Sequence, residues 1–82
     1  MTEDKTMTHE NKRNAIAYVR ADIDMLCEQT EDSERRAFHN RAHGGLFAIR
    51  AGGLITDAEL QVIAQELDAA NTKACGQVRA RR

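Results

Sequence analysis

Two histidines, His39 and His43, stand one helical turn apart in the segment His-Asn-Arg-Ala-His. Helical metal sites use this spacing, because it places two imidazoles on the same face of a helix. The HExxH motif of zinc metalloproteases has a glutamate after its first histidine, but here Asn40 holds that position, so the pair lacks a catalytic base. We therefore expect no metal and no cofactor. A zinc site that also uses Cys27 and Cys75 is the alternative, since an up-down-up bundle would bring both cysteines toward the end where the second helix starts.

The sequence offers no other pattern that supports catalysis. It contains no Gly-rich loop ending in GKS or GKT and no Ser-His-Asp constellation in a recognisable context. Asp22 and Asp24 would point about 160° apart on a helix, so their carboxyl groups cannot share a proton. We predict that the protein is not an enzyme.

A second set of polar residues has the spacing of a binding surface. Arg36, Asn40, His43 and Phe47 recur at three- and four-residue intervals, which aligns them in one row on a helix. An aromatic ring in line with a guanidinium, an amide and an imidazole is typical of a protein interaction hot spot, and it would also suit stacking on a nucleic-acid base. The predicted partner-binding residues are Arg35, Arg36, Asn40, His43, Phe47 and Arg50.

The charges alternate in sign along the chain. Residues 1–34 carry nine acids and four bases, residues 35–56 four arginines and no acid, residues 57–72 four acids and no base, and residues 73–82 four bases. The basic second segment has two interpretations: it is a recognition surface, or it lies between acidic helices and pairs with them. The formal net charge of −1 argues against a general binder of nucleic acids or membrane surfaces.

The elements that must position these residues are helices. The chain has no proline, and apolar residues recur at helical spacing over about 9–29, 33–51 and 57–78. These segments form one domain, residues 9–78, between a disordered tail of residues 1–8 and a basic tail of residues 79–82. In the first segment, Tyr18 and Met25 widen the apolar stripe, so that this helix should contact two neighbours.

Capping residues set the expected helix ends. Asp32 or Ser33 is able to cap the second helix, and Gly52-Gly53 should end it, with a kink possible at Gly44-Gly45. Thr56 and Glu59 form a capping box that starts the third helix.

Short connections between the helices imply antiparallel neighbours. We predict an all-α fold, a small antiparallel three-helix (up-down-up) bundle or a helical hairpin assembly. The supply of apolar residues is thin for a monomer, so we expect a dimer. A heptad-like stripe on the third helix provides the predicted oligomer seam, which consists of Leu60, Ile63, Leu67 and Ala70.

Residues 46–67, centred on the segment AGGLITDAEL, resemble a short helical hairpin found at the C-termini of many bacterial proteins, in which a G-x-I-T-x-x-E-F turn joins two helices. This chain has a second glycine in the turn, and Leu60 replaces the phenylalanine. The resemblance implies an oligomerisation or interaction element.

These features predict a small non-enzymatic protein of the bacterial or phage type that binds another protein as an inhibitor, adaptor or regulator. The alternative is a nucleic-acid-associated regulator that uses the basic second helix and the arginine-rich C-terminus. No apolar run approaches the roughly 20 residues that span a bilayer, and residues 1–10 have no basic, apolar leader. We therefore expect no membrane contact and a cytoplasmic location, where both cysteines would stay reduced.

Overall fold

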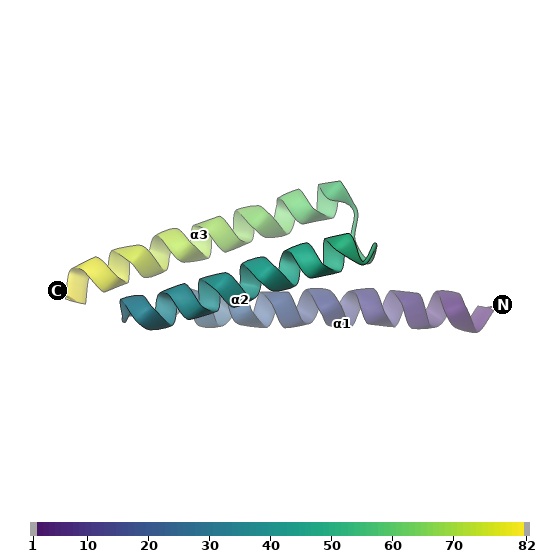
Figure 1. The fold of residues 1–82 in the computed structure, drawn as a ribbon, viewed down its shortest axis with the longest axis horizontal. Coiled ribbons are helices and arrows are strands. Elements are labelled where there is room, and N and C mark those ends of the chain that lie inside the picture. The colour runs from purple at the N-terminus through teal and green to yellow at the C-terminus, as the bar shows by residue number, and fades with distance from the viewer. Residues whose placement is uncertain (1, 82) are drawn as a thin grey trace.

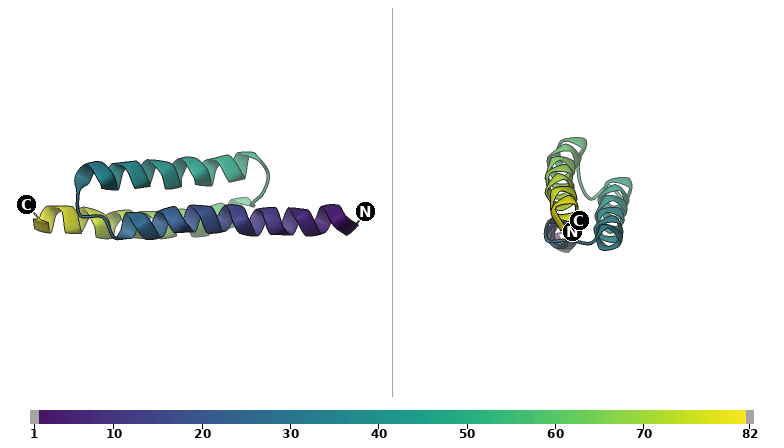
Figure 2. Two further views of the ribbon diagram at one scale, coloured as in Figure 1. Left: turned by 90° about the horizontal axis from the view of Figure 1, so that it is seen from below. Right: turned by 90° about the vertical axis from the view of Figure 1, so that its left-hand side faces the viewer.

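A computed structural model shows an all-α bundle of three helices, and it describes the backbone of residues 2–81 and the side chains of residues 9–81. The helices are α1 (Thr2–Cys27), α2 (Asp32–Ala51) and α3 (Asp57–Arg81). They run up, down and up, so that α1 is parallel to α3 and antiparallel to α2 (Figure 1). Each helix contacts the other two, and the views along and across the bundle in Figure 2 show the three rods side by side. The predicted three-helix architecture is therefore confirmed.

Helix α1 is longer than the sequence predicted. It begins at Thr2, whereas the expected start was His9 after a disordered tail. The segment before His9 contains neither proline nor glycine, so nothing in its composition stops the helix from continuing toward the N-terminus. At the other end of the chain, α3 continues to Arg81, into the predicted basic tail. Met1, Arg82 and the side chains of residues 2–8 lie outside the described part of the chain.

The core is built almost entirely from aliphatic side chains and alanine. One buried cluster draws on all three helices and on Ile55 in the last connection. Leu26 and Leu46 are its largest fully buried side chains. The other buried members are Val19, Ile23, Ala42, Ile55, Ile63, Leu67, Ala70 and Ala74. Several of these residues are alanines, so the helices can approach one another closely, and the bundle measures 56 × 18 × 14 Å.

Glycines shape α2 in two different ways. Gly44-Gly45 does not break the helix, which continues to Ala51. Gly45 instead lies against α1, where a Cβ atom built on it would be 3.4 Å from Val19 Cγ2. At the end of α2, Gly53 has a φ of +76°, a conformation that favours glycine. The backbone N–H of Gly53 donates to Arg50 O and that of Leu54 to Ile49 O, which is the Schellman pattern.

Helix α3 starts as its capping box predicts. The Thr56 backbone N–H donates to Glu59 Oε1 over 2.9 Å, and the Glu59 backbone N–H donates to Thr56 Oγ1 over 3.2 Å. Ile55, which precedes the box, is buried, and Leu60 packs against the same cluster. These local contacts turn the chain from α2 into α3.

The C-terminal part of α3 is joined to the turn between α1 and α2. The Gln77 amide donates hydrogen bonds to the carbonyl oxygens of Cys27 and Gln29, at 3.1 and 2.8 Å. The Cys27 carbonyl lies at the C-terminal end of α1 and the Gln29 carbonyl lies in the connection that follows, so Gln77 acts as a cap supplied from another helix. Arg81 donates to Thr30 Oγ1 at 2.8 Å and pairs with Glu31.

Candidate protein interaction face

The predicted row on α2 forms a continuous stack of rings in its central part. The His43 ring lies 4.7 Å from the Phe47 ring and 5.9 Å from the His39 ring, between centroids. Phe47 is 50% exposed, although it is one of only two phenylalanines in the chain. His43 and Asn40 are also exposed, and His39 is half-buried. The stack adds His39, a residue of the basic second segment, to the predicted partner-binding set.

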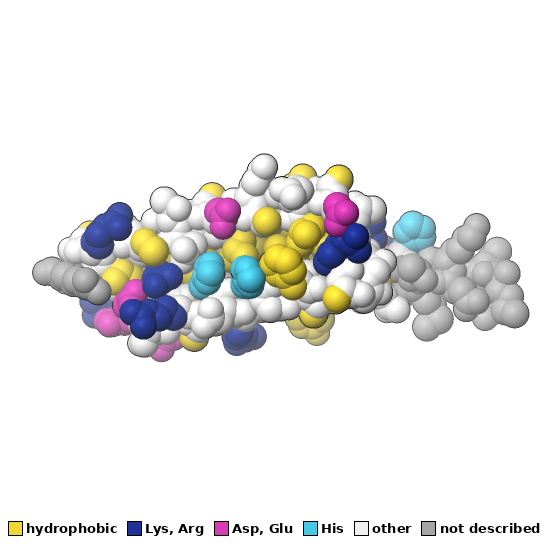
Figure 3. All heavy atoms as spheres, turned by 45° about the horizontal axis from the view of Figure 1, so that its top comes forward, with side chains coloured by type: hydrophobic (Ala, Val, Ile, Leu, Met, Phe, Trp, Pro, Cys, Tyr) yellow, Lys and Arg dark blue, Asp and Glu magenta, His cyan; other side chains and the backbone are white. Residues whose placement is uncertain are grey.

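The neighbouring edge of α3 continues this apolar surface. Arg35 on α2 bonds to Asn71 on α3, and Arg50 bonds to Asp57, which together fix the antiparallel register of the two helices. In this register Phe47 on α2 and Leu60 on α3 lie at the same position along the axis of the bundle. We call the surface made by His39, His43, Phe47, Leu60 and Ala64 the interaction strip. In Figure 3 hydrophobic side chains gather between α2 and α3, with histidines beside them.

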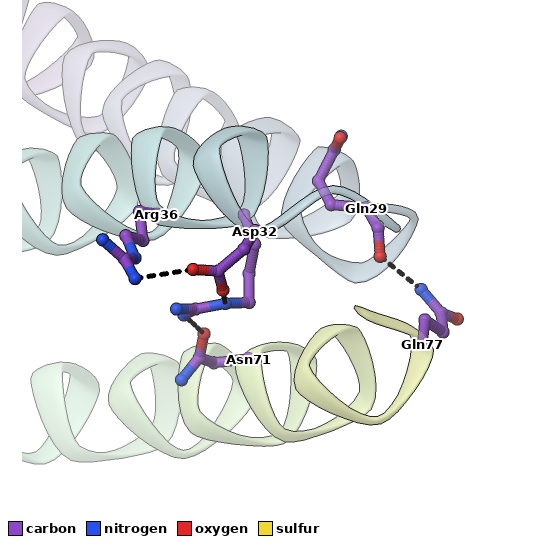
Figure 4. A network of polar contacts seen from close by, with 6 residues as sticks. Gln29, Asp32, Arg36, Asn71 and Gln77 are labelled. Carbon is purple, nitrogen blue, oxygen red and sulfur yellow. Dashed lines mark hydrogen bonds and ion pairs between the residues drawn. The ribbon is translucent and has the colours of Figure 1, made fainter. Parts of the chain in front are cut away.

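The predicted arginines differ in their roles, and Arg35 is a structural residue. Its guanidinium donates to Asp32 Oδ1 at 3.1 Å and to Asn71 Oδ1 at 2.8 Å, and only 16% of its side chain is exposed. Arg36 pairs with the other oxygen of Asp32 at 2.7 Å, but 69% of its side chain remains exposed (Figure 4). Asp32 was predicted to cap α2. Its carboxylate instead pairs with Arg35 and Arg36. Glu31 holds the N-cap position without a side-chain hydrogen bond.

These ion pairs perturb the carboxyl groups that make them. The pKa of Asp32 is lowered, chiefly by the hydrogen bond from Arg35. The pKa of Asp57 is lowered in the same way by the hydrogen bond from Arg50, which is 2.6 Å long. Arg50 therefore links the end of α2 to the start of α3.

Charged pairs also connect α1 to its two neighbours. Arg41 on α2 pairs with Asp22 at 3.2 Å. Arg20 forms a bidentate ion pair with Glu66 on α3, and Lys12 pairs with Glu59 at 2.7 Å. The four arginines of the basic segment therefore pair with carboxylates, as one of its two interpretations predicts, whereas Asn40, His43 and Phe47 are exposed on α2.

The predicted oligomer seam lies inside the bundle. Ile63 and Leu67 are each 2% exposed, Ala70 is 6% exposed, and Leu60 packs partly buried against the same core. The heptad-like stripe is therefore the face that α3 presents to α1 and α2. A contact between copies cannot use Ile63, Leu67 or Ala70, because these side chains are already covered within one chain, whereas Leu60 is only partly buried.

Two residues of the predicted first-helix stripe lie outside the core. Tyr18 is 78% exposed and Met25 is 44% exposed, so the stripe is narrower than the sequence indicated. Helix α1 does contact two neighbours, as predicted, but it does so through the side that carries Val19, Ile23 and Leu26.

The described side chains do not support a metal centre. No group of three or more His, Cys, Asp or Glu residues among them has the arrangement of a metal site. Cys27 and Cys75 are both free thiols and half-buried. The helical spacing of His39 and His43 produces ring stacking.

The chain matches no protein-family model, no curated protein sequence and no solved structure. The hairpin resemblance therefore rests on the turn itself, whose capping box and glycine end are both present in the structure. None of the helices, as far as they are described, is both long and apolar enough to cross a membrane.

Proposed function

We propose that this protein is a non-enzymatic interaction module that binds another protein through the interaction strip and the adjoining polar residues Arg36 and Asn40. It acts as an inhibitor, adaptor or regulator, and it works in the cytoplasm. Phe47 would be the central anchor, with His43 stacked against it and Arg36 at the end of the row.

The observation that carries this proposal is the exposure of Phe47. A core this poor in large side chains would gain from burying a phenylalanine, yet half of the Phe47 surface faces solvent. The ring is also held in place by its contact with His43. An exposed aromatic ring that is already held by a neighbouring ring, with an exposed arginine further along the same row, has the composition of a hot spot, because binding the ring costs little ordering.

The competing function is nucleic-acid binding, and the charge pairs argue against it. Arg35, Arg36, Arg41 and Arg50 all contact carboxylates, and Arg81 pairs with Glu31. A phosphate would have to replace these partners, and the acids would then stand close to the phosphate backbone. The surface is better suited to a protein.

The proposal is tested by capture from a lysate with the tagged protein, with and without nuclease. The informative variant is Phe47→Ala with Arg36→Glu, and its matched control is Tyr18→Ala with Arg13→Glu, which makes the same changes at exposed positions of α1. We expect a nuclease-resistant protein that the control retains and the α2 variant loses. Recovery of nucleic acid alone, or equal capture by both variants, would contradict the proposal.

Self-association belongs to the same proposal. The chain is short and its core consists mainly of small side chains, so pairing would add buried apolar surface that one copy lacks. The proposed protein is a homo-oligomer, with a dimer as the simplest form.

A further inference from the structure

The two edges of the interaction strip carry opposite charge. The α2 edge holds Arg36, Arg50 and the histidines of the strip, and no acidic residue occurs between Arg35 and Thr56. The α3 edge holds Asp57 and Asp68, both exposed, and no basic residue occurs between Asp57 and Thr72. Acidic side chains along the α3 edge are visible in Figure 3. An apolar strip with bases on one side and acids on the other is complementary to a copy of itself that is turned around.

From this arrangement we propose that the strip is the seam of a homodimer in which α2 of each copy covers α3 of the other. The proposal rests on the proposed function, since it places a second copy of the chain on the surface that a target protein would also use. The two-fold axis would lie in the plane of the strip and run parallel to the helices. Such an axis exchanges the α2 and α3 edges without shifting either helix along its length.

The register within one chain determines which residues would meet. Because Arg35 bonds to Asn71 and Arg50 to Asp57, Phe47 is level with Leu60 and His39 is level with Asp68. Rotation about the two-fold axis leaves the position of each residue along the helices unchanged. Phe47 of each copy would therefore pack on Leu60 of the other.

The unpaired charges would be matched in the same way. Asp68 makes no ion pair with any side chain that the structure describes. In the dimer His39 and His43 of the other copy are the groups nearest to it, so the exposed acid of α3 gains a partner. Four helices, two from each chain, would enclose the rings of the strip, which is the arrangement of a four-helix bundle.

The size of the surface sets the expected affinity. Helix α2 has 20 residues, so a contact that runs along the whole helix would be about 30 Å long. Two helices packed side by side are about 20 Å wide, which gives about 600 Å² from each copy and places the contact at the small end of stable interfaces. We therefore expect a dimer that dissociates on dilution, and a target protein that binds the strip must compete with the second copy.

The test is the dependence of molar mass on concentration, measured by sedimentation equilibrium on the full chain. Asp68→Arg puts a base opposite the histidines of the other copy, and the two-fold symmetry repeats this change at two places in the interface. We expect the dissociation constant to rise at least about tenfold. Asp24→Arg is the matched control, because Asp24 is an exposed acid on α1 that makes no ion pair with a described side chain. Adding His43→Glu to Asp68→Arg places an acid opposite the new base and should restore the dimer.

Each result decides the matter. A wild-type dimer that is weakened by Asp68→Arg, kept by Asp24→Arg and restored by the double variant supports the pairing of α2 with α3. A wild-type monomer at every concentration overturns it, as does equal weakening by the two single variants or a double variant that stays monomeric. A monomer that still captures a protein through Phe47 leaves the proposed function standing, whereas a dimer whose capture is independent of Phe47 refutes the proposed function alone.

Discussion

Thr56 and Glu59 satisfy each other's backbone N–H groups, over 2.9 and 3.2 Å, at the point where α3 begins. This reciprocal contact joins the last connection to the bundle, since the Glu59 carboxylate also pairs with Lys12 of α1 at 2.7 Å. One glutamate therefore contributes to the start of one helix and to its docking on another.

Removing the hydroxyl from the capping box should destabilise the fold. Thr56→Ala leaves the Glu59 backbone N–H without its side-chain acceptor, and we expect a loss of about 1 kcal/mol in the free energy of unfolding. Urea denaturation followed by circular dichroism measures it. Thr72→Ala is the control, because Thr72 is exposed inside α3, where alanine favours the helix. Equal effects at both positions would mean that the box contributes nothing.

Acid should weaken the same junction. The pKa of Glu59 is lowered from 4.5 to about 2, first by the hydrogen bond with Lys12 and then by the one from the Thr56 backbone N–H. Because the folded-state pKa lies below the unfolded-state value, the stabilisation is complete above pH 4.5 and is lost as the pH falls toward about 2.

A glutamine at this position removes that dependence. In Glu59→Gln the thermal midpoint should fall less between pH 4.5 and pH 2 than it does in the wild type. Glu28→Gln, which changes an exposed residue without an ion pair to any described side chain, should keep the wild-type slope. A Glu59→Gln variant that loses stability as steeply as the wild type would refute the role of this carboxylate.

The junction between α2 and α3 was predictable from sequence because its chemistry is local. Thr56 and Glu59 are three residues apart, and Gly53 needs only its own φ of +76° to end α2. The start of α1 was not predictable in this way. Residues before His9 lack an apolar pattern, but they also lack a helix breaker, and the helix continues through them to Thr2.

The site was predicted only in part, because periodicity shows that a face is covered without showing what covers it. Ile63 and Leu67 have the spacing of a seam between copies, but they fill the core of one chain. Tyr18 fits the apolar stripe of α1 and is nevertheless 78% exposed. The row from Arg36 to Phe47 was visible as a helical pattern. Its continuation onto α3 depends on the register that Arg35 and Asn71 set, and no local pattern encodes a contact between residues so far apart in the chain.

The glycines of α2 and its turn should respond to alanine in opposite directions. Gly44 is exposed in the helix interior, and a Cβ atom there meets nothing within 4 Å, so Gly44→Ala should stabilise the protein by about 0.5–1 kcal/mol. Gly53 also has open space, but its φ is +76°, so Gly53→Ala should destabilise by about 1 kcal/mol. Thermal unfolding of the two variants, compared with the wild type, shows whether backbone conformation rather than packing decides the effect of each alanine. Effects of the same sign would contradict this assignment.

Arg35 and Arg36 are adjacent and carry the same charge, yet they should contribute differently to stability. The Arg35 side chain is only 16% exposed and connects Asp32 to Asn71, so Arg35→Ala leaves the Asn71 amide oxygen and Asp32 Oδ1 without their donor. We expect a loss of about 1.5 kcal/mol from hydrogen bonds of this charged type. The Arg36 side chain is 69% exposed, and its pair with Asp32 lies within one helix turn, so Arg36→Ala should cost less than about 0.5 kcal/mol.

Chemical denaturation of the two variants compares them, with capture of the protein partner measured in parallel. Arg36→Ala should reduce capture without changing the denaturation midpoint. An equal loss of stability from both substitutions would place Arg36 in the scaffold and remove it from the interaction face.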